Sequence, residues 1–194
     1  MKLNKIGAVL AAAGLFASVQ AAAAPVGYGA ATTGGGSAAA QTVTSLAAMQ
    51  SAIDAYNGTS GLVLYYTGKF NYATITDVCA QWQKPAQTLE VKNKSNITIK
   101  GSPDSTANFG IHIAGAANNI IVQNMTIGLL QGGEAADSIS IEGMSSGKPS
   151  NIWIDHNTIF ASLTSCSGAG DASFDGGIDM KKGCLLYTSP SPRD

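Results

Sequence analysis

Charged residues are scarce in this sequence. They make up 12% of its 194 residues, and the formal net charge is -1. A chain so close to neutral carries no strongly basic surface that would attract nucleic acid or an anionic membrane, so we expect neither as a partner. The same scarcity, together with 23 glycines, favours a β-rich, turn-rich protein over a helical one.

The N-terminal apolar stretch is too short to be a membrane anchor. It covers residues 6–19, fewer than the roughly 20 that a spanning helix needs. It follows a basic start and precedes the small residues 21–24, which is the pattern of a cleaved export signal. We therefore predict a signal peptide over residues 1–24, secretion of the protein, and a flexible Gly/Ala-rich lead-in over residues 25–41.

Cysteine is rare as well, with three residues. Cys79 and Cys166 lie in the body of the chain, where an exported protein would pair them; two unrelated buried thiols are the alternative. The segment 184–194 abandons the pattern before it and looks non-native, although an ordinary disordered terminus rich in Ser and Pro is the alternative. We expect the main domain, residues 42–183, to be cut off after Gly183.

Two short apolar patterns recur along the main domain. One reads Asn, Ile, any residue, then a β-branched residue; it starts at Asn96, returns 23 residues later at Asn119 and again 32 residues later at Asn151. The other alternates apolar and polar residues, and it occurs at residues 89–91, 111–113, 139–141 and 178–180. A constant core with insertions in its turns explains the unequal steps.

This repeat predicts an all-β solenoid. Two strands per unit, with inward Ile or Val alternating with outward polar residues, suit the wall of a parallel β-helix. A β-sandwich of short strands is the rival, but it does not require the same Asn-Ile phrase to recur. Residues 46–56 have helical spacing with Thr44 or Ser45 as cap, and we expect this helix to cover the N-terminal end of the solenoid.

Acidic residues gather late in the chain. Of the twelve acids, seven lie between residues 134 and 179. Asp179 has outward parity, Ser140 is its counterpart on the preceding coil, and Asp137 begins that coil's strand, so Asp137, Asp175 and Asp179 can face one another. Crowded carboxylates suit a hard cation such as Ca²⁺, whereas a solvated acidic face without a specific ion is the alternative.

The sequence resembles the bacterial secreted pectate lyases of polysaccharide lyase family 1. The resemblance runs from about residue 42 to residue 183. It is strongest in five phrases: Cys79–Trp82 (CAQW), Ala107–Ile111 (ANFGI), Val122–Gly128 (VQNMTIG), Asn151–Asn157 (NIWIDHN) and Phe174–Lys181 (FDGGIDMK). It implies a right-handed parallel β-helix with a short N-terminal capping helix, here truncated.

The resemblance also implies site residues. Asp137, Asp175 and Asp179 match calcium ligands, and Asp171 matches an acid implicated in further calcium binding. Lys181 resembles a lysine that pairs with a galacturonate carboxylate. Cys79 and Cys166 match a disulfide pair.

One further ligand departs from the family pattern. The family often carries another acid two residues before the position of Asp137, where this chain has Ala135 with Glu134 beside it.

The reaction that the resemblance implies is calcium-dependent β-elimination of (1→4)-α-D-galacturonan by a monomeric enzyme. In the family an arginine on later coils is the base, but the one arginine here, Arg193, lies outside any matching motif. We therefore assign no catalytic residue in this chain and expect the base beyond Gly183. His156 invites a base assignment, yet it aligns with Asn124 in the repeat and is better explained as a stacked turn residue. We interpret His112 as an outward strand residue.

Two other functions fit the same fold. A pectin lyase would act on methylated substrate without calcium, but a neutral substrate would not need the acids that this chain retains. A non-catalytic polysaccharide-binding β-helix would share the repeat and would need no converging acids at all.

Overall fold

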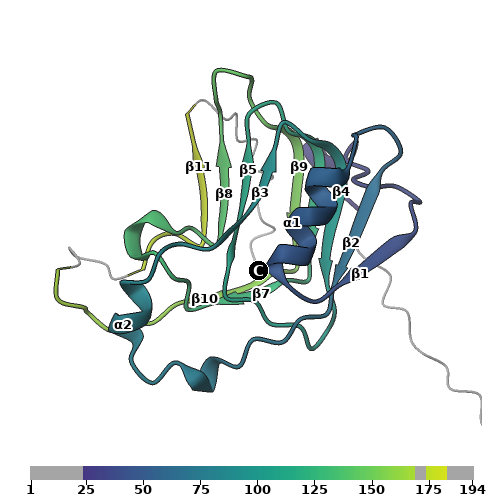
Figure 1. Cartoon of the computed structure of the whole chain (residues 1–194). Coiled ribbons are helices and arrows are strands. Elements are labelled where there is room, and N and C mark those ends of the chain that lie inside the picture. Colours follow the sequence, from purple (N-terminus) through teal and green to yellow (C-terminus); the bar gives the residue numbers. More distant parts are fainter. Residues whose placement is uncertain (1–23, 169–173, 183–194) are drawn as a thin grey trace, which may run out of the picture.

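The computed structural model describes residues 24–168 and 174–182, and every pairing between its strands is parallel (Figure 1). The strands form three sheets, in the orders β1-β2-β4-β6-β9, β3-β5-β8-β11 and β7-β10. Successive coils stack strand on strand, which is a parallel β-helix and confirms the predicted fold class. The all-parallel pairing excludes the sandwich alternative, because sandwiches are built from antiparallel sheets.

The elements follow the chain in this order: β1 (Ala40–Val43), α1 (Leu46–Ala55), β2 (Leu62–Tyr66), α2 (Val78–Trp82), β3 (Thr88–Lys92), β4 (Ser95–Gly101), β5 (Gly110–Ala114), β6 (Asn118–Gln123), β7 (Thr126–Gly128), β8 (Ile139–Glu142), β9 (Ser150–Asp155), β10 (Thr158–Phe160) and β11 (Ile178–Lys181). Three 3-10 turns add η1 (Gly27–Gly29), η2 (Tyr72–Thr74) and η3 (Gly133–Ala135).

The repeat seen in the sequence is the core of the solenoid. Ile97 of β4 pairs in register with Ile120 of β6, which pairs with Ile152 of β9. The side chains of Ile97 and Ile120 are fully buried. Each buried aliphatic side chain contributes roughly 1.5–3 kcal/mol relative to an exposed one, so stacked isoleucines stabilise the coils strongly.

The recurring asparagines take a backbone conformation that few residues adopt. Asn96, Asn119 and Asn151 have φ of 61°, 59° and 52°, in the left-handed region that asparagine tolerates better than most side chains. The Asn119 amide also donates to Oδ1 of Asn96 at 2.8 Å. Asparagine therefore recurs because it both permits the bend and links adjacent coils.

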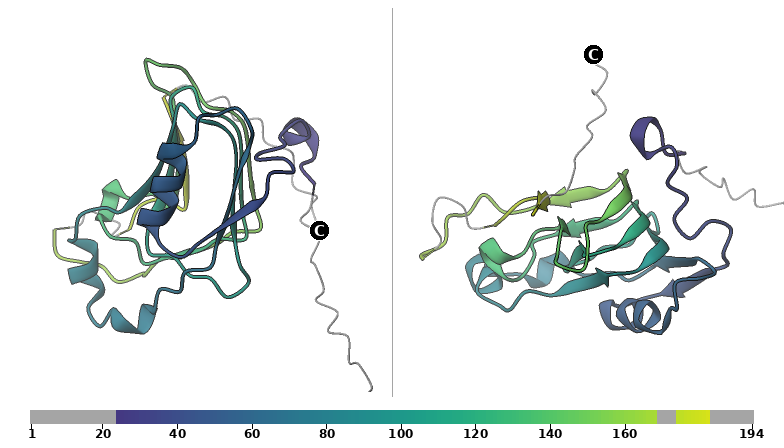
Figure 2. Two further views of the ribbon diagram at one scale, coloured as in Figure 1. Left: turned by 45° about the vertical axis from the view of Figure 1, so that its right-hand side comes forward. Right: turned by 90° about the horizontal axis from the view of Figure 1, so that it is seen from above.

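Helix α1 lies across one end of the ring of coils (Figure 2). Its Met49 and Ile53 are buried against the solenoid, as expected of a cap over that end. The Ser45 hydroxyl accepts a hydrogen bond from the Ala48 amide at 3.2 Å. Of the two predicted caps, Ser45 is therefore the one that the structure shows.

The segment predicted as a flexible lead-in makes specific contacts. Its amides at Thr33 and Gly34 donate to Oδ1 of Asn119 at 2.7 and 2.8 Å, and β1 begins within it at Ala40. Among the described helices, none has the length and apolarity needed to cross a membrane.

Both ends of the chain fall outside the described residues. The predicted signal peptide does so apart from its last residue, and so does the tail 184–194. Gly183, where we predicted that the main domain is cut off, also lies outside them, and the last described residue is Lys182. The predicted domain boundary at Gly183 therefore stays a prediction.

Candidate functional site

The site begins where β8 and β11 pair. The amide of Ser138 donates to the carbonyl of Gly176 at 3.2 Å, and the register places Asp179 beside Ser140. Asp137 lies two residues before β8. The predicted match of Asp179 with Ser140 is confirmed, and it brings two acid-bearing segments together.

Lys181 joins two of the predicted carboxylates. Its ammonium lies 3.1 Å from Oδ2 of Asp179 and 3.4 Å from Oδ2 of Asp137. The Asp137 side chain is only 4% exposed, whereas those of Lys181 and Asp179 are 44% and 41% exposed. A buried carboxylate thus meets a half-exposed cation at the surface of the sheet. We call Asp137, Asp175, Asp179 and Lys181 the carboxylate cluster.

The surroundings oppose the ionisation of Asp137. Burial raises the pKa of this carboxyl, and the nearby charges of Asp175 and Asp179 raise it too, while Lys181 lowers it. The pKa of Lys181 is raised in turn, first by its hydrogen bond with Asp179. Asp137 and Asp179 therefore share one ammonium while the charge of Asp175 acts nearby, and additional positive charge would be favourable here.

One atom of the cluster has no partner. Oδ1 of Asp137 is buried without a hydrogen bond, and a Cβ added at Gly176 would come within 3.3 Å of it. Glycine therefore leaves the approach to this oxygen open. Carboxylate oxygens are the ligands that Ca²⁺ prefers, so the donor set fits that ion.

The described residues do not form a complete metal centre. Within residues 24–168 and 174–182, no three His, Cys, Asp or Glu side chains converge as metal ligands would. Asp171 lies outside the described residues, as does the side chain of Glu134. The predicted roles of Asp137, Asp171, Asp175, Asp179 and Lys181 stay predictions.

The predicted location of the base is likewise untested. We expected the base beyond Gly183, and Gly183 and all residues after it lie outside the described part of the chain. The structure therefore places no catalytic residue at the site, and the absence of an assigned base stays a prediction.

The two histidines are held by acids that do not belong to the carboxylate cluster. His112 on β5 contacts Oε2 of Glu90 at 2.9 Å and Oε2 of Glu142 at 3.1 Å. It is an outward strand residue, as predicted, but the sequence did not reveal that it bridges two carboxylates on neighbouring coils. Alignment of the strands could have shown this contact, because it places Glu90 beside His112 and Glu142 two residues further along the next strand.

His156 is a turn residue. Its φ of 51° matches the 55° of Asn124, its counterpart on the preceding coil, and its side chain is 66% exposed. Its Nδ1 lies 2.6 Å from Oδ1 of Asp155. These features support the turn interpretation over a general base.

A disulfide joins Cys79 of α2 to Cys166. The link crosses from the excursion between β2 and β3 to the segment between β10 and β11. It settles the alternative of two separate thiols in favour of a pair.

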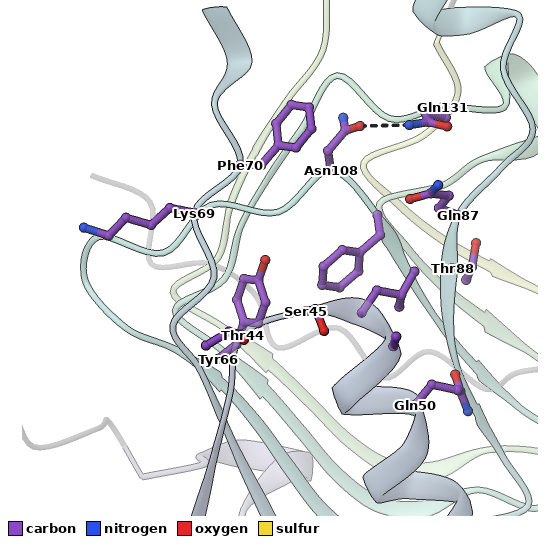
Figure 3. A pocket seen from close by; sticks show the side chains of 13 residues that line it. Thr44, Ser45, Gln50, Tyr66, Lys69, Phe70, Gln87, Thr88, Asn108 and Gln131 are labelled. Atoms are coloured by element: carbon purple, nitrogen blue, oxygen red, sulfur yellow. Dashed lines mark hydrogen bonds between the residues drawn. The ribbon is translucent and has the colours of Figure 1, made fainter. Parts of the chain in front are cut away.

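A separate cavity of about 710 Å³ lies near the start of α1 (Figure 3). Its lining includes the rings of Tyr66, Phe70 and Phe109 and contains no acid. Two of its amide side chains have partners: Gln131 donates to Asn108 at 3.4 Å, and Gln50 pairs with the backbone of Glu90. This cavity therefore offers no carboxylate ligand for a metal ion.

Known proteins share both the sequence and the fold. The profile of a family described as "Pectate lyase" matches residues 4–189. Pectate lyase 3 of Pectobacterium carotovorum subsp. carotovorum is 37% identical over 180 residues, which cover 82% of this chain and 46% of that protein.

Solved structures agree. Pectate lyase II from Xanthomonas campestris pv. campestris is 71% identical with a TM-score of 0.80, over 82% of this chain and 48% of that one. Pectate lyase C from Erwinia chrysanthemi, solved with 30 mM Ca²⁺, is 34% identical with a TM-score of 0.69, over 84% and 50%. A pectate lyase C variant was solved in complex with pentagalacturonic acid, at 35% identity and a TM-score of 0.69 over 82% and 49%. This chain thus spans about half the length of the structures it matches.

Proposed function

The chain belongs to the pectate lyase family, and on that premise we propose that its carboxylate cluster binds Ca²⁺ for the β-elimination of polygalacturonate. The observation that carries the proposal is Oδ1 of Asp137, a buried carboxylate oxygen without a partner, beside two further acids. A buried carboxylate oxygen without a hydrogen bond is costly, and a bound cation at that oxygen would offset the cost.

We assign Asp137, Asp179 and Asp175 as the ligands, with Asp171 as a further acid. When bound, Ca²⁺ would act as a Lewis acid that draws charge from the substrate carboxylate and so acidifies the neighbouring C5 proton. Asp137 would give the ion a buried anchor, because its side chain is only 4% exposed. The exposed Asp175 and the half-exposed Asp179 would complete the site from the solvent side.

Lys181 would position the substrate. Its ammonium is 44% exposed at the edge of the cluster, and its raised pKa keeps it charged at neutral pH. A charged lysine can pair with a galacturonate carboxylate but cannot accept the C5 proton. It is therefore a binding residue rather than the base.

The base is not assigned to any residue of this chain. The carboxylates of the cluster are committed to a cation and His156 is a turn residue. The expectation that an arginine of later coils, beyond Gly183, serves as base therefore stands as part of the proposal. We also propose that the protein is secreted, which agrees with the disulfide, since such bonds persist in oxidising compartments.

The test is turnover of polygalacturonate by the complete gene product, followed through the ultraviolet absorbance of unsaturated products. We expect chelation of Ca²⁺ to lower the rate of product formation by at least about 100-fold, because the ion supplies several kcal/mol of transition-state stabilisation. Asp137→Asn should lose activity in the same way. The matched control is Asp104→Asn, at an 82% exposed aspartate paired with Lys69, which should keep it.

Other outcomes would contradict the proposal in distinct ways. Undiminished activity after chelation would reject the calcium mechanism. Activity only on methylated pectin would indicate a pectin lyase, and binding of polygalacturonate without turnover would indicate a non-catalytic polysaccharide-binding protein.

A further inference from the structure

Two acid-bearing segments form the carboxylate cluster, and both lead back to helix α2. One segment runs from β7 through η3 to Asp137 and β8. The other runs from β10 to Asp175 and β11, and Cys166 lies within it. The described residues of these two segments carry no strand between their ends, so the positions of those residues depend on contacts with the rest of the molecule.

The first segment is held at its start by two amide side chains. Gln81 of α2 donates to Oδ1 of Asn108 at 2.8 Å. Asn108 in turn donates to the carbonyl of Gly128 at 2.8 Å, and its amide also contacts the carbonyl of Leu129. Gln81 and Asn108 are both buried. Helix α2 thereby fixes the backbone as it leaves β7.

The same segment is held in its middle by Trp82. A Cβ added at Gly133 would fall well inside contact distance of the Trp82 indole, so ring and backbone lie directly against each other. Gly133 has φ of 55° and is buried, and it lies four residues before Asp137. The indole Nε1 is buried without a hydrogen-bond partner, so the ring contributes packing and not a polar contact.

The second segment is held by the disulfide. Cys79, three residues before Trp82 on the same helix, is bonded to Cys166, which is 3% exposed. Cys166 belongs to the segment that returns to the solenoid at Asp175. One short helix therefore contacts both acid-bearing segments, one through Gln81 and Trp82 and the other through a covalent bond.

We propose that α2 is a brace that positions the Ca²⁺ ligands, with Trp82 and the Cys79–Cys166 disulfide as its positioning residues. This inference rests on the proposed calcium site. Groups outside the ligand shell that orient metal ligands typically affect affinity by 10- to 100-fold when they are changed. Loss of the disulfide should accordingly weaken Ca²⁺ binding about tenfold, even where the chain stays folded.

The experiment is a calorimetric titration of Ca²⁺ into the full oxidised chain and into the Cys79→Ser/Cys166→Ser double variant. Both are held at a temperature where circular dichroism shows them folded. The matched control is Ile97→Ala, a fully buried residue of β4 whose truncation also destabilises the solenoid. A brace predicts weaker Ca²⁺ binding by the cysteine variant and unchanged binding by the folded control.

A second pair of variants keeps the disulfide and tests whether α2 positions the Ca²⁺ ligands even if the double cysteine variant fails to fold. Trp82→Ala removes the ring from Gly133 and should weaken Ca²⁺ binding in the same direction. Trp82→Phe keeps an aromatic ring there, although a smaller one than the indole, and the N–H that it loses has no partner; its Ca²⁺ dissociation constant should therefore lie between those of Trp82→Ala and the wild type.

Equal Ca²⁺ dissociation constants for wild type, the folded cysteine variant and Trp82→Ala would overturn the brace and leave the calcium site intact. A wild-type chain that binds no Ca²⁺ would overturn the proposed function and the brace together. The two failures are therefore distinguishable in one set of titrations.

Discussion

At the scale of single residues, Asp137 and Lys181 define the electrostatics of the site. The ammonium of Lys181 is the influence that lowers the pKa of Asp137, against burial and two acids that raise it. Asp137 can stay ionised in a buried position because Lys181 is beside it. A cation that binds the cluster would share the carboxylates of Asp137 and Asp179 with the ammonium of Lys181.

Replacing Lys181 should therefore change how Asp137 titrates. With Lys181→Met, the remaining influences all raise the pKa of Asp137, so without Ca²⁺ its carboxyl should hold its proton to higher pH than in the wild type. The measurement is a carbon-13 NMR titration of the aspartate carboxyls. Lys69→Met, at the exposed pair with Asp104, is the control that should leave Asp137 unchanged. A titration midpoint of Asp137 that is unchanged or lower in Lys181→Met would contradict this account.

Glu142 should give the chain part of its acid sensitivity. Its pKa is lowered, first by the hydrogen bond from Lys182 and also by His112. A carboxyl whose folded pKa is lowered adds stability above its ordinary pKa of 4.5, and that stability is lost as the pH falls through the folded value.

Glu142→Gln should consequently flatten the fall in melting temperature between about pH 5 and pH 3. A partly exposed pair contributes about 1 kcal/mol at most, which corresponds to roughly 2–4 °C for a chain of this size. Calorimetry at several pH values measures it. Glu90→Gln alters the more exposed carboxylate on His112 and serves as comparison. Equal acid sensitivity in wild type and Glu142→Gln would refute the assignment.

At the scale of elements, a single side-chain hydroxyl, that of Ser45, caps the start of α1. Ser45→Ala should cost about 1 kcal/mol, because the Ala48 amide loses its acceptor. That loss lowers the melting temperature by roughly 2–4 °C. Thr44→Ala changes the neighbouring exposed residue and should have little effect. If Thr44→Ala were the more damaging of the two, the cap would be misassigned.

The asparagine positions make a sharper test of the solenoid. Asn119→Gly keeps the left-handed backbone and loses the amide contacts, whereas Asn119→Ala loses both. Alanine should therefore be the worse replacement, by about 1–2 kcal/mol in the free energy of unfolding measured with urea. Asn118→Ala is the matched control, since Asn118 is an asparagine of the same strand whose backbone φ is not positive. Equal losses for glycine and alanine would show that the backbone conformation does not matter.

Elements with a repeat, or with a helical pattern as long as that of α1, could be predicted from the sequence, and shorter elements without a repeat could not. The Asn-Ile phrase located β4, β6 and β9 because each coil must present the same bend and the same buried side chains. Helix α2 has five residues, too few for a periodic pattern, and its importance lies in contacts with distant segments. The position of Lys181 between Asp137 and Asp179 also escaped prediction, because sequence parity places side chains on a face but does not say where a long one reaches.

At the scale of the whole molecule, the last coil of the described part presents apolar side chains to solvent. Ile178 on β11 is 50% exposed, although its parity is inward as predicted, and Phe160 on β10 is 38% exposed. In the described part, β11 and β10 lie at the edges of their sheets. Unpaired edges with apolar side chains promote association between chains.

This chain should therefore self-associate at high concentration, in contrast to the monomer that the family resemblance implies. Light scattering after size exclusion would show the larger species, and Ile178→Lys should reduce them by placing a charge on the edge. A cooperative melt together with monomeric elution at all concentrations would contradict this expectation.

The central claim is that Asp137 anchors a Ca²⁺ site on a pectate lyase β-helix. Calorimetric titration of Ca²⁺ into the oxidised chain, into Asp137→Asn and into Asp104→Asn tests it most directly. The account predicts saturable binding by the wild type and by Asp104→Asn, and loss of that binding in Asp137→Asn. Binding that Asp137→Asn leaves unchanged, or no binding by the wild type, would contradict it.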